Sequence, residues 1–307
     1  MRRAVAAFLA CAALAVPLFP AGSAGAAGIR EIDVVSYNVL APPWASPVWY
    51  PEIDDPSLLD TAARRERIRA FLRSARDTAE LVCLQEVAAS ELPAFAAALG
   101  PGFVGAMSFN DPDFWSDWVV PPIPWEPNGT ALFARTSAFT GVVVEDRALG
   151  TGNHAALLTA THVGTGARLR AWSLHLDSDR TNNRRTEIET VFGATPPEPH
   201  STDVLCGDMN EDTVVGSLAG RVRRAGFVDV LAAVGNRDAT HPWSETYYSS
   251  PRWAILDHVL VRGATPLRGT TIDAGVAAIP DQSTRIEELL RRMGSDHYPV
   301  EATVRLP

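Results

Sequence analysis

Lysine is absent from the chain, so all 27 residues of the Lys-plus-Arg class are arginine. A Walker-type phosphate-binding loop and Schiff-base chemistry both require lysine, and neither can operate here. Acidic residues outnumber basic ones, which leaves a formal net charge of -9 at pH 7. An acidic protein has no general attraction to polyanions. A nucleic acid or an anionic lipid would therefore have to be held by a local site.

Cysteine is scarce as well. Cys83 and Cys206 lie in apolar, strand-like segments, and Cys11 lies near the N-terminus. Only Cys83 and Cys206 lie beyond the N-terminal apolar run, and these two are too few for a structural zinc site. A disulfide is permitted in a secreted protein, but the sequence does not show whether the two Cα atoms approach closely enough. We favour two buried free thiols at Cys83 and Cys206.

The N-terminus has the organisation of a secretory signal peptide. Arg2 and Arg3 precede an apolar run over 4–18, and Ala24-Gly25-Ala26 has the form that signal peptidase accepts. Proline interrupts the run before it reaches the roughly 20 residues that a membrane anchor needs. We expect residues 1–27 to be a signal peptide and the mature protein to be secreted. Residues 28–307 show no linker or internal repeat and are predicted to form one domain.

Short β-branched segments alternate with amphipathic stretches along the chain. Strands are predicted over 32–39, 81–85, 169–176, 204–206 and 254–261, and helices over 61–76, 91–99, 182–192 and 286–293. Ser90 is the expected cap of the second helix, and the arginines of the first helix are placed on its polar face. This mixture predicts an α/β fold with some antiparallel pairing.

Two long stretches, 41–56 and 108–127, are rich in aromatic residues and proline and fit no regular element. Loops of this kind often form lids or binding rims, and an equally good interpretation is that their rings pin ordinary loops to the core.

Polar residues at the ends of the predicted strands are not explained by strand propensity. Alone, each is more often a cap or a turn former than a catalyst. Their order is more specific, because six segments follow one another: Ser36-Tyr37-Asn38-Val39-Leu40, Leu84-Gln85-Glu86-Val87, Ser173-Leu174-His175-Leu176, Gly207-Asp208-Met209-Asn210, Leu256-Asp257-His258-Val259 and Ser295-Asp296-His297-Tyr298-Pro299. This series resembles the endonuclease/exonuclease/phosphatase (DNase I-like) superfamily over nearly the whole of residues 28–307.

The resemblance implies a four-layered sandwich, in which two mixed β-sheets pack face to face with helices outside. It also implies a metal site at Asn38, Glu86 and Asp296. Carboxylate and amide oxygens suit Mg²⁺, and Mn²⁺ is the alternative. Pancreatic-type DNases, deadenylases and neutral sphingomyelinases all belong to this superfamily.

The remaining matched residues are given catalytic roles by the same resemblance. Asp208 would orient or deprotonate the attacking water, and Asn210 would fix Asp208 and contact the phosphate. His175 and His297 would donate to phosphate oxygens, and Asp257 would set the tautomer or charge of His297. His258 is interpreted as a mere neighbour of Asp257, His154 and His162 as structural or loop histidines, and Asn128 as a turn residue that could approach the phosphate.

The predicted function is that of a secreted phosphodiesterase, acting as a monomer, with nucleic acid slightly favoured as substrate. Ala88 and Ala89 stand where the DNase branch has an arginine, which argues against tight duplex binding. The alternative is a sphingomyelinase-like phospholipase C that contacts membranes through the aromatic loop 109–125. A third hypothesis is a non-catalytic secreted binding protein with the same fold.

Overall fold

The computed structural model describes residues 30–111, 126–242 and 255–307. The predicted signal peptide and residues 112–125 of the aromatic loop lie outside these ranges. Among the described helices, none combines the length and the apolar character needed to span a membrane.

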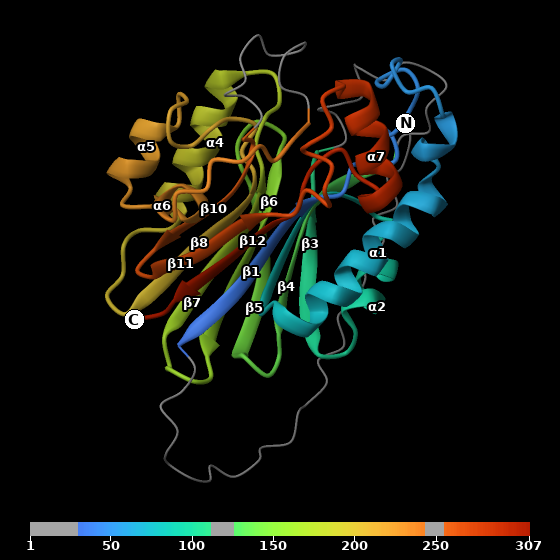
Figure 1. The fold of residues 1–307 in the computed structure, drawn as a ribbon. Helices are drawn as coiled ribbons and strands as arrows, with labels where there is room; N and C mark the ends of the chain where they lie inside the picture. Colours follow the sequence, from blue (N-terminus) through green and yellow to red (C-terminus); the bar gives the residue numbers. More distant parts are fainter. Residues whose placement is uncertain (1–29, 112–125, 243–254) are drawn as a thin grey trace, which may run out of the picture.

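Two mixed six-stranded sheets form the centre of the molecule (Figure 1). The first has the order β11 (Thr265–Thr271), β12 (Val300–Arg305), β1 (Glu31–Asn38), β2 (Leu81–Ala88), β4 (Asn128–Arg135) and β3 (Phe103–Phe109). The second has the order β5 (Phe139–Ala148), β6 (His154–His162), β7 (Arg168–His175), β8 (Ser201–Asp208), β10 (Asp257–Arg262) and β9 (Val228–Asp229). Strands β1 and β2 pair in parallel, as do β7 and β8, and the other pairs are antiparallel.

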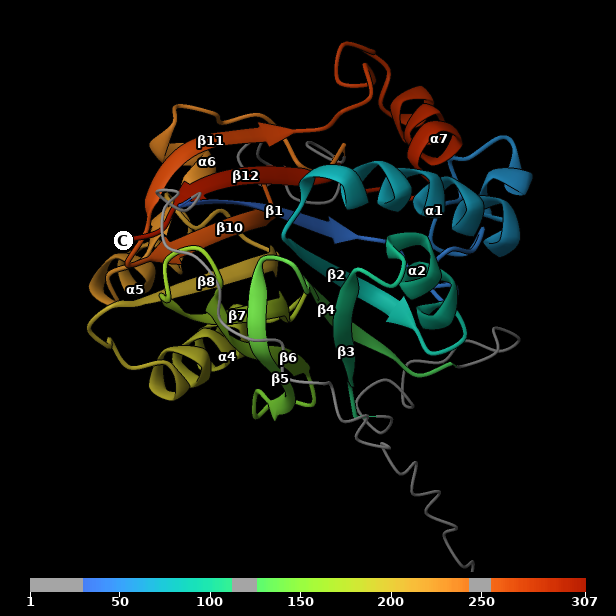
Figure 2. The same ribbon diagram turned by 90° about the horizontal axis from the view of Figure 1, so that it is seen from below.

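Helices cover the outer face of each sheet, as Figure 2 shows from below. On the first sheet these are α1 (Thr61–Thr78) and α2 (Leu92–Leu99), with α7 (Gln282–Met293) and the 3₁₀ turn η1 (Pro56–Leu59) beside them. On the second they are α4 (Thr181–Ala194) and α5 (Ala219–Arg224), with the short α6 (Val230–Ala233) near β10 and β11. The predicted four-layered α/β sandwich is confirmed.

The core between the sheets is built from alternate residues of the facing strands, including Val34, Leu81 and Val204. Cys83 and Cys206 lie in this layer and form a disulfide, with a Cα–Cα distance of 6.1 Å. The favoured interpretation of two free thiols was therefore wrong. Strand alternation directs the two side chains toward each other across the interface, and only the sheet packing reveals their proximity.

Two predicted details of the helices were also wrong. Ser90 does not cap α2, because its hydroxyl lies 3.0 Å from Glu126 and the helix begins after Glu91 without a side-chain cap. Arg64 is not on the polar face of α1 but fully buried. Its guanidinium donates to the carbonyl oxygens of Leu40 (2.5 Å) and Gly294 (2.7 Å), and so ties together two loops that lead into the site described next.

Candidate active site

Strand alternation carries several predicted residues to one end of the layer between the sheets. Side chains along a strand point alternately to opposite faces. On β1, the face that carries the core residues Ile32 and Val34 continues to Asn38. The same alternation brings His175 on β7 and Asp208 on β8 to the inner face of the second sheet. The core thus ends in a polar cluster.

The pairing of β8 with β7 and β10 places His175, Asp208 and Asp257 side by side. Asp208 is paired with His175 on β7 and with Asp257 on β10. Nε2 of His175 lies 3.6 Å from Oδ2 of Asp208. Asn38 reaches the same carboxylate from the opposite sheet, with its Nδ2 at 3.1 Å from Oδ2 of Asp208. Asp208 therefore contacts side chains from both sheets.

Glu86 does not follow the alternation of β2, and a backbone irregularity redirects it. Its φ is 57°, and the pairing of β2 with β4 shifts register between Leu84 and Val87. A bulge of this kind re-aims a side chain, and a non-glycine residue at positive φ carries strain. The redirected carboxylate accepts from Nδ2 of Asn38 (2.9 Å) and from the backbone nitrogen of Ala41 (3.0 Å).

The segment after β8 holds Asp208 in place. The backbone nitrogen of Asn210 donates to Oδ1 of Asp208 at 2.8 Å, and Asn210 itself has a φ of 49°. Nδ2 of Asn210 donates to the carbonyl of Leu176 at 2.8 Å, so this donor is engaged within the protein. Gly207 is required by the close approach of β7, because a Cβ there would lie 2.0 Å from the carbonyl oxygen of Leu174.

His297 is held by a buried carboxylate. Its Nδ1 lies 2.7 Å from Oδ2 of Asp257, while its Nε2 faces Oδ2 of Asp208 at 3.6 Å. Burial alone would lower the pKa of His297, but the carboxylates of Asp257, Asp296 and Asp208 outweigh it and hold that pKa well above its ordinary value. An imidazolium can donate from both nitrogens.

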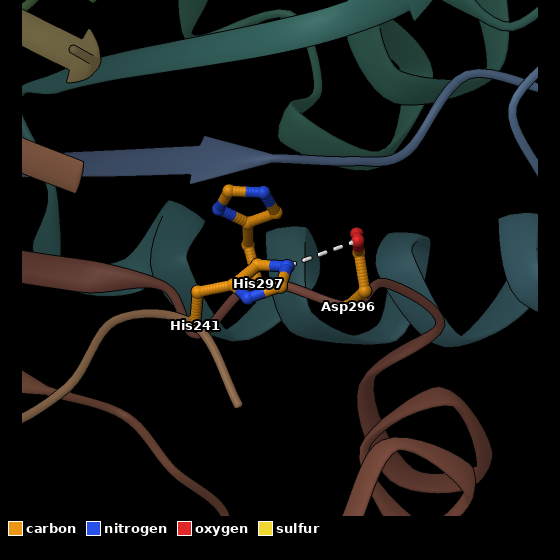
Figure 3. A group of neighbouring side chains, drawn as sticks. All are labelled: His241, Asp296 and His297. Atoms are coloured by element: carbon orange, nitrogen blue, oxygen red, sulfur yellow. Dashed lines mark hydrogen bonds and ion pairs between the residues drawn. The ribbon is translucent and has the colours of Figure 1, made fainter. Parts of the chain in front are cut away.

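Asp296 has two partners that the sequence did not indicate. Its Oδ2 accepts from the hydroxyl of Tyr50 (2.7 Å) and lies 3.2 Å from Nε2 of His241. Figure 3 shows His241 directed at Asp296, with the His297 ring edge-on at a centroid distance of 4.5 Å. Tyr50 stood out only as one ring of the stretch 41–56, and nothing in the sequence around His241 marked it.

A metal ion would meet mainly oxygen ligands here. Glu86 and Asp208 supply carboxylate oxygens, which Mg²⁺ and Mn²⁺ prefer. The amide of Asn38 donates to both carboxylates, and its oxygen accepts from the backbone nitrogen of Leu40 at 3.0 Å. Among the described residues, two tight groups could also hold a cation: His241 with Asp296 and His297, and Asp208 with Asp257 and His297.

Neither tight group contains Glu86, and in both of them His297 would have to give up its donor role. Oδ2 of Asp296 is also already shared by two donors. Glu86 and Asp208 are therefore the carboxylates whose chemistry best fits an ion, and Asn38 donates to both of them.

A pocket of about 320 Å³ opens over these groups. Glu86, His175, Asp208 and His297 line it together with His241 and Asp296. Trp44 and Trp49 also line the pocket, at a ring-centroid distance of 5.7 Å, as do Asn110, Asn128 and Asn153. No arginine is among the described residues that line it. Among the described lining residues, only the histidines can therefore carry positive charge.

The three histidines that were given no catalytic role have partners away from this pocket. His258 is fully buried, with Nδ1 at 2.6 Å from Oδ2 of Asp229. His154 lies 2.9 Å from Asp146, and His162 interacts with Thr165 in its own turn. Asn128 begins β4 and lines the pocket.

The predicted site residues come from six separate segments and meet in this one place. A model of the endonuclease/exonuclease/phosphatase family matches residues 35–297. The chain belongs to this family. As a family member, it is a metal-dependent phosphoester hydrolase.

Solved structures share the fold of this chain. The endonuclease/exonuclease/phosphatase protein from Bacteroides vulgatus has a TM-score of 0.64 at 16% identity, over 90% of this chain and 99% of that one. ANGEL2, a 2′,3′-cyclic phosphatase in complex with adenosine-2′,3′-vanadate, has a TM-score of 0.62 at 15% identity, covering 91% and 96%. D. rerio TDP2, in complex with a single-strand DNA product, has a TM-score of 0.57 at 16% identity, covering 90% and 99%. No curated protein matches the chain. At such identities these neighbours describe the fold alone.

Proposed function

We propose that this family member is a secreted phosphodiesterase that uses Mg²⁺ or Mn²⁺ and acts on single-stranded nucleic acid or its fragments. The observation that carries the proposal is the position of Asp208, within 3.6 Å of both His175 and His297 and bonded to Asn38. One carboxylate beside two imidazoles suits a reaction in which water is deprotonated while phosphate oxygens gain charge. Secretion is supported by the signal-peptide pattern of residues 1–27.

Each residue then has a definable task. Asp208 orients a water and accepts its proton as the water oxygen bonds to phosphorus. The ester phosphorus–oxygen bond on the opposite side breaks, and the leaving oxygen takes a proton from solvent. His297, kept as imidazolium by Asp257, and His175 donate to the non-bridging oxygens. The bound ion would neutralise charge on the phosphate and help to position the water. Asn38 keeps Glu86 and Asp208 facing this ion.

The pocket composition argues for a substrate with few phosphates near the cleaved bond. Its described lining combines four carboxylates, Glu86, Asp179, Asp208 and Asp296, with no arginine. A duplex, which presents many phosphates, gains little from such a surface. An exposed ring such as Trp49 can stack on an unpaired base. The nucleotide-related ligands named for ANGEL2 and TDP2 are consistent with this choice.

A phospholipase C of the sphingomyelinase type is the second candidate. Val48, Trp49 and Phe109 are 54%, 36% and 41% exposed and belong to, or directly adjoin, segments that line the pocket. Apolar side chains at the mouth of a phosphoester site would suit a bilayer surface. This proposal includes the membrane contact through residues 109–125, and in both proposals the protein acts as a monomer.

The test is to express residues 28–307 and to measure hydrolysis of single-stranded DNA, RNA and sphingomyelin vesicles with Mg²⁺, Mn²⁺ or EDTA. Asp208→Ala serves as the inactive control. Metal-dependent nucleic-acid cleavage that is lost in the variant would support the first proposal. Phosphocholine release would replace it with the second. If no diester is cleaved and calorimetry detects no metal binding, a non-catalytic binding protein becomes the better interpretation.

A further inference from the structure

Three asparagines meet on the pocket wall although they come from both sheets. Asn110 follows β3, Asn128 begins β4, and Asn153 precedes β6. The backbone nitrogen of Asn110 donates to the carbonyl of Asn128 at 3.0 Å, and that of Asp111 donates to Gly152 at 2.8 Å. These bonds join the three segments directly. We call Asn110, Asn128 and Asn153 the amide wall.

The close approach of β3 and β4 at this wall depends on a glycine. A Cβ at Gly129 would lie 1.9 Å from the carbonyl oxygen of Ser108. Any larger residue would push the strands apart and separate Asn110 from Asn128. The side-chain arrangement of the wall is therefore a consequence of close backbone packing.

The described residues use only part of the hydrogen-bonding capacity of this wall. Asn110 Oδ1 accepts from the backbone nitrogen of His154 (2.9 Å), and Asn153 Nδ2 donates to Oε1 of Glu187 (2.9 Å). The other polar atom of each amide, Nδ2 of Asn110 and Oδ1 of Asn153, has no hydrogen bond among the described residues. Nδ2 of Asn128 is buried and likewise lacks a partner there, although Asn128 is only 3% exposed and lines the pocket.

An unsatisfied buried donor costs free energy unless a ligand or water completes it. The wall also carries no charge of its own, so it favours a neutral group that both accepts and donates hydrogen bonds. A second phosphate would find no cation among these amides, and an aliphatic chain would leave the amides unpaired.

We propose that the amide wall is a subsite for the nucleoside attached to the scissile phosphate, and that it recognises the neutral sugar hydroxyl or base edge by hydrogen bonds. This inference rests on the proposed phosphodiesterase function and narrows its substrate class. The subsite gives the enzyme a preference for nucleotide esters over other esters that share the same phosphate and leaving group.

The experiment compares methyl p-nitrophenyl phosphate with the 5′- and 3′-(p-nitrophenyl phosphate) esters of thymidine. All three release the same phenol, and only the last two present a nucleoside. The variants are Asn128→Ala and the near-isosteric Asn128→Leu, with Asn182→Ala on the exposed part of α4 as matched control. Folding of each variant is checked by thermal unfolding.

We expect kcat/KM for at least one thymidine ester to fall about tenfold in both Asn128 variants, the loss of roughly one hydrogen bond. Hydrolysis of the methyl ester should stay within about twofold of the parent enzyme. An equal loss on all esters, or no loss on any, would overturn the proposal. So would a parent enzyme that prefers p-nitrophenyl phosphocholine to both thymidine esters.

Failure of the proposed function can be told apart from failure of the subsite. If the parent protein cleaves none of these esters, calorimetric titration with thymidine 5′-monophosphate and thymidine 3′-monophosphate is the deciding measurement. Binding to the parent that is weakened about tenfold in Asn128→Leu would retain the subsite without catalysis. Binding that is absent, or equal in both proteins, would remove it.

Discussion

Oδ2 of Asp257 lies 2.7 Å from Nδ1 of His297, and Asp257 is wholly buried beneath the imidazole. The other oxygen of Asp257 has no hydrogen-bond partner among the described residues. Because Asp257 is buried, its negative charge is stabilised mainly by the ion pair with His297. His297 and Asp257 thus act as one unit.

Asp257→Asn removes the negative charge of this pair and keeps the size and shape of the side chain. The amide fits the same space but does not stabilise an imidazolium. We therefore expect kcat to fall by up to about 10⁴-fold, the loss seen when a catalytic histidine loses its carboxylate. Hydrolysis of a p-nitrophenyl diester measures this loss, and circular dichroism reports whether the variant is folded. A folded variant with unchanged kcat would show that Asp257 has no catalytic role.

Glu86→Gln should weaken metal binding. The side chain can keep a contact with Asn38 or Ala41 but loses the negative charge that a divalent cation needs. We expect the dissociation constant for Mn²⁺ to rise at least tenfold by calorimetry, with a comparable loss of metal-stimulated activity. Glu66→Gln on the exposed side of α1 is the matched control. Equal metal affinity in parent and Glu86→Gln would place the ion elsewhere, with the His241 and Asp296 group as the next candidate.

Reduction of the Cys83–Cys206 disulfide should destabilise the protein substantially. The bond closes a loop with a sequence separation of 123 residues. A loop of that size corresponds to about 4–5 kcal/mol of chain entropy in the unfolded state. Urea unfolding with and without reductant measures the difference, and the double variant Cys83→Ala/Cys206→Ala should show no response to reductant. Equal stability of the oxidised and reduced parent protein would contradict this expectation.

The buried His258–Asp229 pair should make stability depend on pH in two directions. The pair lowers the pKa of Asp229 from 3.8 to about 2, because attraction to His258 outweighs the opposing effect of burial. This stabilisation, roughly 2 kcal/mol, is present above about pH 4 and is lost as the pH falls toward 2. Asp229 also raises the pKa of His258 above its ordinary 6.5, although burial opposes that shift. The contribution of His258 is therefore complete below pH 6.5 and declines as the pH rises through its folded-state pKa.

His258→Gln tests this pH dependence. The free energy of unfolding, measured by urea titration from pH 3 to pH 9, should differ most between parent and variant at about pH 4 to 6.5 and converge at both ends. A difference that stays constant over the whole range would mean that the pair contributes through packing alone.

Much of the site was predictable because its residues follow local rules. Asn38, His175 and Asp208 lie at strand ends, on the same strand face as the apolar core residues that precede them. This alternation can be read from the sequence. Glu86 was identified by its motif, but its orientation depends on a bulge that pairing with β4 creates. Tyr50 and His241 could not be predicted, since each meets Asp296 from a loop whose path is set by other elements. Arg64 was misplaced because helical periodicity does not show which arginine meets unpaired carbonyl groups.

By itself the sequence determined the α/β class, the strands that end in polar residues and the family, because periodicity and motif order are local properties of the chain. Only the tertiary structure decided that Cys83 and Cys206 are bonded and that Asp296 is shared by Tyr50 and His241. It also brought Asn110, Asn128 and Asn153 together on one wall. These relationships join residues far apart in the chain, and they exist only after two sheets have packed face to face and set the distances between their edges.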